Sequence, residues 1–368
     1  MVALKVAILT GFDPYEYKGG LEKYILNLVK VLRHKKYEIE IFFPKNFRTF
    51  KDIFSYTSKI KNEIEKNYEL LIMNSPYSAF AYDFNIKKIV IFHGSFRAMA
   101  EYTKDYIKVE DYLSWYYVYG IVESMNLFSP YNIVVSPFLK TLLEKLYGEG
   151  DKKKQLIVIE NGVDTNKFKP IVNKGALREK YGIPKDAFVG LFVGRNDSTK
   201  GYDIFTKVFG ETKKYVYWIQ ALSSGGVNQY EILPIKTFKE VNENTMIELY
   251  NLSDFTYLPS RFEGFGYSFV ESLSCCTPAI TTDIGIAREF SGLWNELKIR
   301  DPKGNLEYMI EVSIKAIKLL KEYPYIRYYL GNLGREEVLR KYSMEIWEKK
   351  ILKLINKLIN HTSSSPNE

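Results

Sequence analysis

Two glutamates, Glu263 and Glu271, flank a glycine-bracketed turn in the second half of the chain. Gly264 and Gly266 make one continuous helix through both glutamates unfavourable. The apolar, β-prone run 255–258 comes before them, so the segment predicts a strand, a glycine-rich turn and a helix. Backbone N–H groups at the start of such a helix can bind a phosphate or a polyhydroxylated ligand, and the carboxylates can accept hydrogen bonds from its hydroxyls.

A purely structural explanation of the same segment is also open. Ser268 and Glu271 have the spacing of a capping box, which satisfies the first N–H groups of a helix and requires no ligand. The sequence of this segment does not decide between the two interpretations.

Two other segments carry groups that suit phosphate. Gly19 and Gly20 follow the first predicted strand, and a helix expected to begin near Gly20 would direct its amides at a ligand. Arg195 and Lys200 follow a strand in the second half, where a guanidinium fork and a compact ammonium can both engage phosphate oxygens. Taken alone, the first pair is also typical of a turn and the second of solvated charges.

Histidine and cysteine usage argues against a metal site or a disulfide framework. His93 follows a predicted strand, whereas His34 and His361 lie in a basic helix end and near the end of the chain. No histidine metal site is therefore expected. Cys275 and Cys276 are adjacent and are the only cysteines, so neither disulfides nor a zinc site is predicted.

Length and composition fit a protein of two domains without a membrane span. The chain has 368 residues, of which 46% are hydrophobic and 15% aromatic. Its apolar runs are shorter than the about 18 residues of a spanning helix, and residues 1–5 lead directly into a strand, so a cytoplasmic location is predicted.

The net charge of +8 is compatible with an anionic donor or an anionic membrane surface. The basic residues between 18 and 66 are better explained by a solvated helix face than by a membrane patch. No nucleic-acid motif is present, so a nucleic-acid partner is not expected.

Strand-like and helix-like segments alternate along the chain, which predicts an α/β fold with a parallel sheet in each half. The predicted strands are 5–10, 39–43, 70–73, 89–92, 133–135, 156–159, 188–193, 215–218, 255–258 and 279–281.

Proline and glycine near residues 168–184 mark the join between the two domains. We expect an N-terminal Rossmann-like domain, a C-terminal Rossmann-like domain, a helix that packs back toward the N-terminal domain, and a disordered tail. Their predicted bounds are 1–170, 171–340, 341–360 and 361–368.

The motif Pro-Ser-x-x-Glu-Gly-Phe-Gly at 259–266, with Glu271 after seven intervening residues, resembles the E-x7-E signature of retaining glycosyltransferases of family 4. Gly-Arg-x4-Lys-Gly at 194–201 and Asn-Gly-Val-Asp at 161–164 are similar to two further segments of that family. The resemblance implies a GT-B architecture, with two facing Rossmann-like domains and a cleft between them.

The same resemblance implies roles for individual residues. It assigns the catalytic roles to Glu263, Arg195, Lys200 and His93. It assigns donor binding to the glycine-rich turns, the second glutamate and a loop at 237–241 that lies against the nucleobase: Gly19, Gly20, Gly264, Phe265, Gly266, Glu271 and Val241. No metal ligand and no cofactor are implied.

Two segments depart from the family pattern. Cys276 and Ile286 stand where family members commonly have glycine, and Arg288 adds a positive charge near the expected phosphates. These departures make the donor preference less transferable than the fold.

The implied function is transfer of a sugar, with retention of anomeric configuration, from a nucleotide-diphosphate sugar to a hydroxyl of a glycan, lipid or small molecule. The alternatives are a sugar-nucleotide epimerase or hydrolase of the same architecture, or a non-catalytic sugar-nucleotide binding protein. The sequence does not identify the nucleotide, the sugar, the acceptor or the oligomeric state.

The segment 98–131 is rich in aromatic residues, and two explanations are open. The rings pack in the core or at an interface, or some line the acceptor side and contact lipid headgroups. With the basic segment, the second explanation implies a lipid-linked acceptor and a peripheral contact at the inner face of the membrane.

Overall fold

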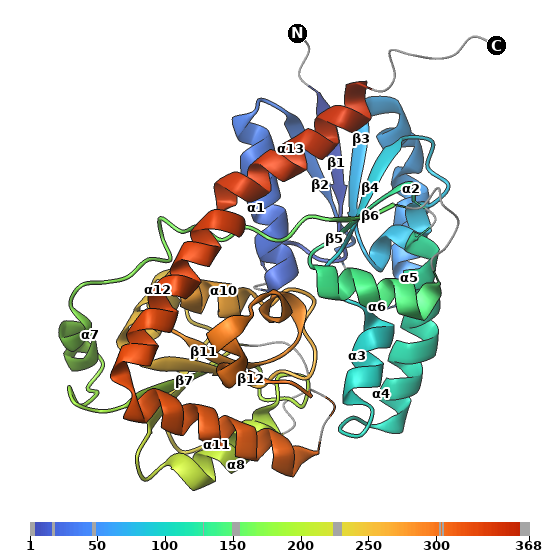
Figure 1. Cartoon of the computed structure of the whole chain (residues 1–368). Helices are drawn as coiled ribbons and strands as arrows, with labels where there is room; N and C mark the ends of the chain where they lie inside the picture. Colours follow the sequence, from blue (N-terminus) through green and yellow to red (C-terminus); the bar gives the residue numbers. More distant parts are fainter. Residues whose placement is uncertain are drawn as a thin grey trace. The chain divides into compact units, whose positions relative to one another are not determined.

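The computed structural model describes residues 4–16, 19–45, 49–127, 129–148, 155–223, 230–301, 303 and 305–360. The chain divides into two compact units, shown in Figure 1. The first comprises Met1–Ala100, Glu110–Asn161 and Trp347–Glu368, and the second comprises Glu101–Val109 and Gly162–Ile346. The predicted tail 361–368 lies outside the described residues.

Each unit is built on one six-stranded sheet in which all neighbouring strands are parallel. The α/β class is thereby confirmed. The strands of the first sheet are β1 (Lys5–Leu9), β2 (Glu38–Phe42), β3 (Leu70–Asn74), β4 (Lys87–Phe92), β5 (Tyr131–Val134) and β6 (Gln155–Val158). Those of the second are β7 (Val189–Gly194), β8 (Tyr217–Leu222), β9 (Lys236–Lys239), β10 (Phe255–Leu258), β11 (Ala279–Thr282) and β12 (Lys298–Ile299).

Helices connect the strands of both units. In the first part of the chain they are α1 (Gly20–His34), α2 (Phe50–Asn67), α3 (Phe96–Thr103), α4 (Val109–Leu113), α5 (Gly120–Asn126) and α6 (Pro137–Tyr147), with a 3₁₀ turn η1 (Tyr77–Ala81) and a π-helical turn η2 (Ser114–Tyr119). In the remainder they are α7 (Lys174–Lys180), α8 (Tyr202–Thr212), α9 (Glu243–Leu252), α10 (Tyr267–Ser274), α11 (Leu306–Glu322), α12 (Pro324–Lys341) and α13 (Met344–Asn360), with 3₁₀ turns η3 (Gly285–Glu289) and η4 (Gly292–Leu297). No helix within these described ranges is long and apolar enough to cross a membrane.

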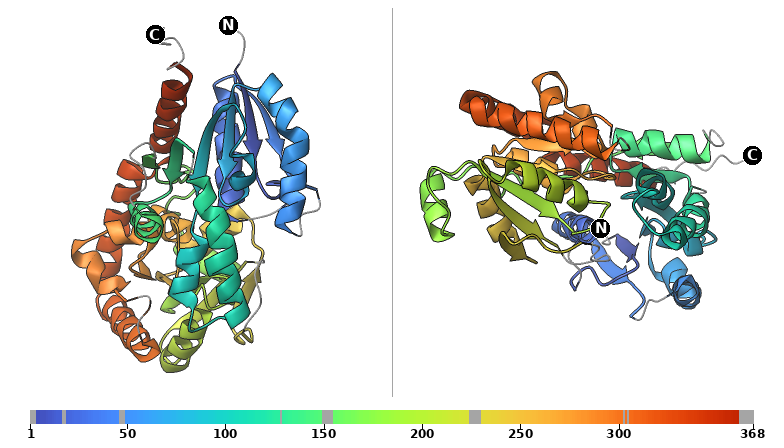
Figure 2. Two further views of the ribbon diagram at one scale, coloured as in Figure 1. Left: turned by 90° about the vertical axis from the view of Figure 1, so that its right-hand side faces the viewer. Right: turned by 90° about the horizontal axis from the view of Figure 1, so that it is seen from below.

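The first sheet is covered on both faces, which explains why its inner strands β1, β3 and β4 are largely apolar and buried. Leu28 of α1 and Ile351 of α13 line one small apolar cavity with Ile72, Ile89 and Ile133 of the strands, so both helices lie on the same face. Figure 2 shows α13 along one side of this sheet and α2 along the other.

The α13 helix is fixed to the first unit by ring contacts and ion pairs. The ring of Trp347 packs edge-on against Tyr24 of α1 with centroids 5.1 Å apart. Lys350 pairs with Glu160 at 2.6 Å, and Lys35 pairs with Glu348 at 3.1 Å. The α13 helix therefore completes the first unit, although it follows the second unit in sequence.

The second sheet has the strand order β12-β11-β10-β7-β8-β9. The chain leaves β7 toward β8 and β9, and then returns to the opposite side of β7 to form β10. The connections after β7 and β10 therefore lead in opposite directions from two neighbouring strands. In open parallel sheets, ligands bind at this kind of switch point, outside the carboxyl ends of the strands.

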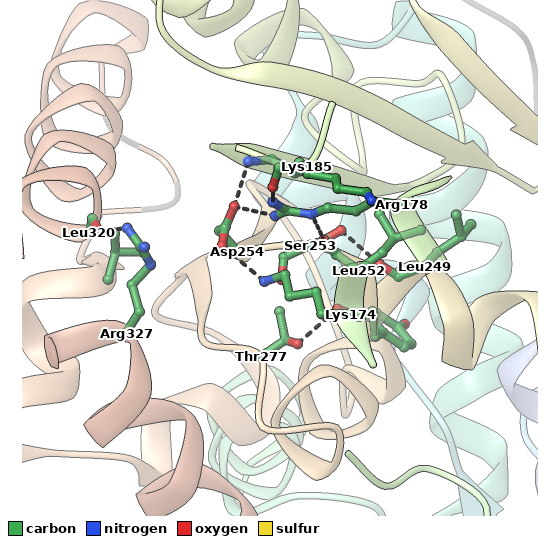
Figure 3. A network of polar contacts seen from close by, with 12 residues as sticks. Lys174, Arg178, Lys185, Leu249, Leu252, Ser253, Asp254, Thr277, Leu320 and Arg327 are labelled. Carbon is green, nitrogen blue, oxygen red and sulfur yellow. Dashed lines mark hydrogen bonds and ion pairs between the residues drawn. The ribbon is translucent and has the colours of Figure 1, made fainter. Parts of the chain in front are cut away.

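A buried ion-pair network holds the opposite, amino edge of the same sheet (Figure 3). Arg178 of α7 donates to Asp254 at 2.8 Å and to the carbonyl of Leu252 at 3.0 Å, and Lys174 donates to Asp254 at 2.9 Å. Asp254 also accepts the backbone N–H of Val189 at the start of β7. Together these contacts lower the pKa of Asp254, although its burial acts in the opposite direction.

Two predicted element boundaries were wrong. The strand expected at 215–218 begins at Tyr217, because the amides of Tyr215 and Val216 close the turn after α8 by bonding to the carbonyl of Thr212. The loop expected at 237–241 starts as the edge strand β9, which pairs with β8. A short strand rich in lysine gives little apolar alternation, so the pattern did not reveal it.

Candidate functional site

The first site loop follows β7 and carries Arg195 and Lys200. Arg195 Nε lies 2.5 Å from Asp197 Oδ2, and Asp197 Oδ1 accepts the backbone N–H of Lys200 at 3.0 Å. Asp197 thus links the guanidinium to the backbone at Lys200. Gly201 ends the loop with φ of 67°, in the left-handed region that favours glycine.

The second site loop follows β10 and carries Glu263. The Glu263 carboxylate accepts from Lys200 Nζ at 2.5 Å and from Ser260 Oγ at 2.9 Å. The structure therefore brings Arg195, Lys200 and Glu263 together in two loops that follow neighbouring strands, at the carboxyl edge of the second sheet.

The turn after Glu263 is closely packed against a third loop. Gly266 is the N-cap of α10 with φ of 98°, and Phe265 is buried. Ile286 donates its N–H to the carbonyl of Phe265 at 2.8 Å, and a Cβ on Gly285 would lie 2.5 Å from that oxygen. Contact with this turn therefore requires glycine at position 285, the first of the two glycines in the family motif. Ile286, which replaces the second, is buried in the core.

Glu271 lies in the second turn of α10 and is only 7% exposed. Tyr250 of α9 donates to its carboxylate at 3.1 Å, and burial raises the pKa of Tyr250. The capping-box alternative was wrong, because α10 begins at Tyr267 and Ser268 is its second residue rather than its N-cap.

Val241 lies between β9 and α9, next to the carboxyl end of a strand. Glu240 has φ of 49°, and its N–H donates to the carbonyl of Leu222 in β8. Asn242 caps α9 by accepting the N–H of Thr245 at 2.9 Å. The segment that contains Val241 is therefore an ordered bend whose backbone is held on both sides.

Cys276 adopts φ of 59°, a conformation that glycine favours and other residues seldom adopt. This position is one of the two where the sequence departs from the family motif. The backbone there contacts α12, because a Cβ on Gly331 would lie 2.1 Å from the carbonyl of Cys276.

His93 belongs to the first unit and follows β4 directly. Its Nε2 lies 2.7 Å from Asn74 Oδ1, and Tyr24 packs edge-on against its ring with centroids 4.8 Å apart. Because a carboxamide oxygen only accepts, Nε2 carries the proton and Nδ1 is an acceptor. Burial lowers the pKa of His93 to about 3, so the ring is neutral near pH 7.

Gly19 and Gly20 also lie in the first unit, at the start of α1 as predicted. Gly19 is the N-cap without a side-chain capping bond, and a Cβ there would lie 2.4 Å from Glu22 Oε2. The carboxylate of Glu22 thus folds back toward the N-terminus of α1. An anion bound to these amides would have to displace it, because two negative charges repel each other there.

The charged groups of the second unit's site are balanced. Arg195 pairs with Asp197, and Lys200 pairs with Glu263. The side chains of Arg195, Lys200 and Glu263 are partly exposed, whereas that of Asp197 is nearly buried. Across the residues that the structure describes, no three His, Cys, Asp or Glu side chains are grouped so that they could hold a metal ion.

Sequence reasoning missed three residues that shape this site. Asp197 fixes Arg195, Ser260 shares the Glu263 carboxylate with Lys200, and Tyr250 bonds to Glu271. Asp197 and Ser260 lie inside the quoted motifs, which is a signal that could have identified them. Tyr250 lies in α9, and no motif in the sequence links that helix to Glu271.

Comparison with known proteins assigns the two halves to glycosyltransferase domains. Residues 18–167 match the model "Glycosyltransferase Family 4", and residues 173–307 match "Glycosyl transferases group 1". A glycosyltransferase of Methanocaldococcus jannaschii, MJ1178, which is itself uncharacterized, is 25% identical over 96% of this chain and 97% of its own. The alpha-galactosylglucosyldiacylglycerol synthase of Streptococcus pneumoniae is 28% identical over 46% of this chain and 50% of its own.

Solved structures share the fold over nearly the whole chain. Sucrose-phosphate synthase from Thermosynechococcus elongatus superposes with a TM-score of 0.80 at 17% identity, covering 98% of this chain and all of that one. Anabaena HepE in complex with UDP-glucose gives a TM-score of 0.73 at 14% identity, covering 96% of this chain and all of that one.

The two Rossmann-like units and these matches define a glycosyltransferase of the GT-B architecture. More particularly, its N-terminal part is similar to family 4 glycosyltransferase domains and its C-terminal part to group 1 glycosyl transferase domains.

Proposed function

We propose that this glycosyltransferase moves a sugar from a nucleoside diphosphate sugar to a hydroxyl acceptor with retention of anomeric configuration. The observation that carries the proposal is the Lys200–Glu263 pair at the switch point of the second sheet, with Arg195 in the same loop as Lys200. A switch point is where parallel sheets bind nucleotides, and a cation next to a carboxylate suits a sugar bonded to a phosphate.

The donor's diphosphate would bind at Arg195 and Lys200, which would stabilise the negative charge that grows on the leaving phosphate. Its sugar hydroxyls would bind Glu263 and the backbone amides of Gly264, Phe265 and Gly266, which lead into the N-terminus of α10. Arg195 Nε donates to Asp197, and the planar fork would place the terminal nitrogens of the guanidinium on the phosphate oxygens.

The nucleoside would bind on the other side of the same helix. Glu271 would hold the ribose, and the bend at Val241 would lie against the base. The burial of Glu271 supports this role, because a carboxylate with few waters gains from a hydroxyl partner. Backbone groups at Val241 would not distinguish strongly among uracil, guanine and adenine.

In the proposed mechanism the leaving phosphate takes the proton from the incoming hydroxyl on the same face of the sugar. This pathway explains retention without a glycosyl-enzyme, since the sequence offers no second carboxylate as an evident nucleophile. We propose that Arg195 and Lys200 make a metal ion unnecessary. The protein then contributes position and charge stabilisation.

The acceptor would bind through the first unit. His93, also in this unit, keeps the catalytic role that the family resemblance implies, and its neutral ring can form a hydrogen bond with a hydroxyl. A row of exposed apolar side chains on α4, η2 and α5 supports a glycan or lipid-linked acceptor and a peripheral membrane contact. These side chains are Leu113, Tyr117, Val118 and Ile121 of the first unit, and Val109, which ends the segment Glu101–Val109 of the second unit.

A screen of UDP-, GDP- and ADP-sugars for release of nucleoside diphosphate tests the proposal. Each donor is assayed alone and with lipid and glycan acceptors. We expect release with one donor class, accelerated by an acceptor. Release that an acceptor never accelerates would indicate hydrolysis, and no release with any donor would contradict the proposed donor class.

A further inference from the structure

Arg261 lies two residues before Glu263, and its side chain is completely buried. Its guanidinium makes a bidentate ion pair with Asp203 in the first turn of α8, at 2.7 and 2.6 Å. The ring of Tyr106, in the segment Glu101–Val109 of the same unit, stacks on the guanidinium with its centroid 3.4 Å from Cζ. The charge is therefore paired and shielded from water, and it is not available to a ligand.

The same residue binds the loop that carries Lys200. Arg261 Nη1 donates to the carbonyl of Ser198 at 2.7 Å, and the Arg261 backbone N–H donates to the carbonyl of Thr199 at 2.8 Å. These two carbonyls directly precede Lys200, and Asp203 follows it by three residues. One side chain and its backbone thus hold the Lys200 loop from both sides.

Contact between the two loops leaves little room for adjustment. A Cβ on Gly201 would lie 2.0 Å from the carbonyl of Pro259, and the positive φ of Gly201 also disfavours any other residue. The first loop therefore rests on the second at Gly201 and is bonded to it through Arg261. Lys200 lies between these two attachments and reaches Glu263 at 2.5 Å.

We infer that Arg261 is a positioning residue for donor chemistry: it sets the separation between the Lys200 ammonium and the Glu263 carboxylate. The inference rests on the proposed function, because these two groups are the ones assigned to the donor. Only the planar fork of arginine can bond to Asp203 through two nitrogens while one of them also reaches a carbonyl. Lysine keeps the charge but offers one nitrogen.

The test compares Arg261→Lys with Arg178→Lys. Both substitutions replace a buried arginine that is paired with an aspartate in the second unit, but Arg178 lies at the amino edge of the sheet, away from the site loops. We expect kcat of Arg261→Lys to fall about 100-fold, since small displacements of catalytic groups cost that much. The affinity for the bare nucleoside, which lacks the diphosphate, should change much less, because its proposed partners Glu271 and Val241 lie outside the Lys200 loop.

Arg178→Lys should lower the melting temperature at least as much as Arg261→Lys while kcat stays within about twofold, as expected for a site that acts on stability alone. Unchanged kcat in Arg261→Lys would overturn the inference. Equal losses of kcat in the two variants would also overturn it, because the effect would then follow stability.

Asp203→Asn provides a second variant if Arg261→Lys does not fold. The asparagine keeps the size of the side chain and one acceptor oxygen for the guanidinium of Arg261. Asp203→Asn should therefore lower kcat, as Arg261→Lys does. Wild-type kcat in folded Asp203→Asn, with the loop amides as protected as before, would contradict the inference.

Amide hydrogen exchange separates this inference from the proposed function. The amides of Lys200, Gly201 and Arg261 are hydrogen-bonded within or between the two loops. We expect faster exchange at 197–203 in Arg261→Lys and not in Arg178→Lys. If the wild type releases no nucleotide from any donor, the proposed function fails. Unchanged exchange in this segment would then show separately that Arg261 does not hold the loop.

Discussion

Lys200 Nζ lies 2.5 Å from Glu263 Oε1, so the two charged groups that we propose for donor binding form an ion pair with each other. They come from loops that follow β7 and β10, two neighbouring strands at the switch point of one sheet. A diphosphate sugar would exchange this pair for two new ones, with phosphate on the lysine and sugar hydroxyls on the glutamate. The ion pair holds both groups in place with no net charge.

Arg195→Ala and Lys200→Ala should each reduce kcat/KM about 100-fold or more, which corresponds to about 3 kcal/mol of lost transition-state stabilisation. The reason is that both cations meet charge that grows on the leaving diphosphate. Steady-state kinetics with the donor found in the screen measures the effect, and thermal unfolding provides the control for stability. Near-normal turnover in either variant would remove that residue from the phosphate site.

Glu271→Gln and Glu263→Gln should separate nucleotide binding from transfer. Glu271→Gln should weaken binding of the bare nucleoside diphosphate, because a carboxamide accepts a ribose hydroxyl less strongly than a carboxylate does. Glu263→Gln should leave that affinity mostly intact and impair transfer. Calorimetric titration with the nucleotide measures both, and equal affinities of wild type and Glu271→Gln would contradict the role of Glu271.

Transfer should be unaffected by a chelator. Because Arg195 and Lys200 are proposed to supply the positive charge, the rate in EDTA should match the rate without it. The assay is run on protein dialysed against EDTA, and Mg²⁺ or Mn²⁺ is then added back. A loss of activity that either ion restores would show that a divalent cation takes part.

Glu123 should make the first unit less stable as the pH rises from about 5 to 8. Its buried carboxyl accepts hydrogen bonds from Ser95 at 2.8 Å and Tyr147 at 2.7 Å, and burial raises its pKa from 4.5 to about 7. The folded chain then binds more protons than the unfolded chain between these values, so the stabilisation is complete below pH 4.5 and lost as the pH rises through 7. At about 1.4 kcal/mol for each pKa unit, the full change is about 3 kcal/mol.

Urea unfolding of Glu123→Gln and wild type across this pH range measures that effect. The neutral carboxamide cannot ionise, so the stability of the variant relative to wild type should increase with pH. The low pKa of His93 affects both proteins equally and cancels in the difference. A difference that does not depend on pH would show that Glu123 is already ionised in the folded chain.

The exposed row on α4, η2 and α5 should contribute to binding of lipid vesicles. Val109 and Ile121 are 68% and 57% exposed, and replacing both with serine removes apolar surface that would enter the headgroup region. Co-sedimentation with anionic vesicles at low salt should decrease severalfold. Absence of wild-type binding would leave a soluble glycan or small molecule as the acceptor.

The alternation of apolar strands and amphipathic helices was enough to predict the α/β class and ten strands, because the inner strands of both sheets are buried along almost their whole length. It did not reveal β9, whose lysines face solvent at a sheet edge, or β12, which has two residues after a 3₁₀ turn. Strand order, and hence the switch point between β7 and β10, depends on long-range pairing that periodicity does not encode.

The sequence selected charged residues that the structure brings together in the second unit, but it did not reveal their contacts. Motif spacing selected Arg195, Lys200 and Glu263, yet nothing in the sequence indicated that Lys200 and Glu263 would pair. The sequence also left open how the aromatic rings of segment 98–131 pack. Tyr112 and Tyr116 stack on each other at 5.5 Å and Arg97 lies over Tyr116, so these rings pack locally while Tyr117 remains exposed.

The most direct test of the central claim is proton NMR of the reaction with an α-linked nucleoside diphosphate sugar and its acceptor. The anomeric signal of the donor should decline together with growth of an α-anomeric signal on the acceptor and of free nucleoside diphosphate. That result would establish donor class, transfer and retention in one experiment. A β-linked product, or free sugar alone in the presence of acceptor, would contradict the account.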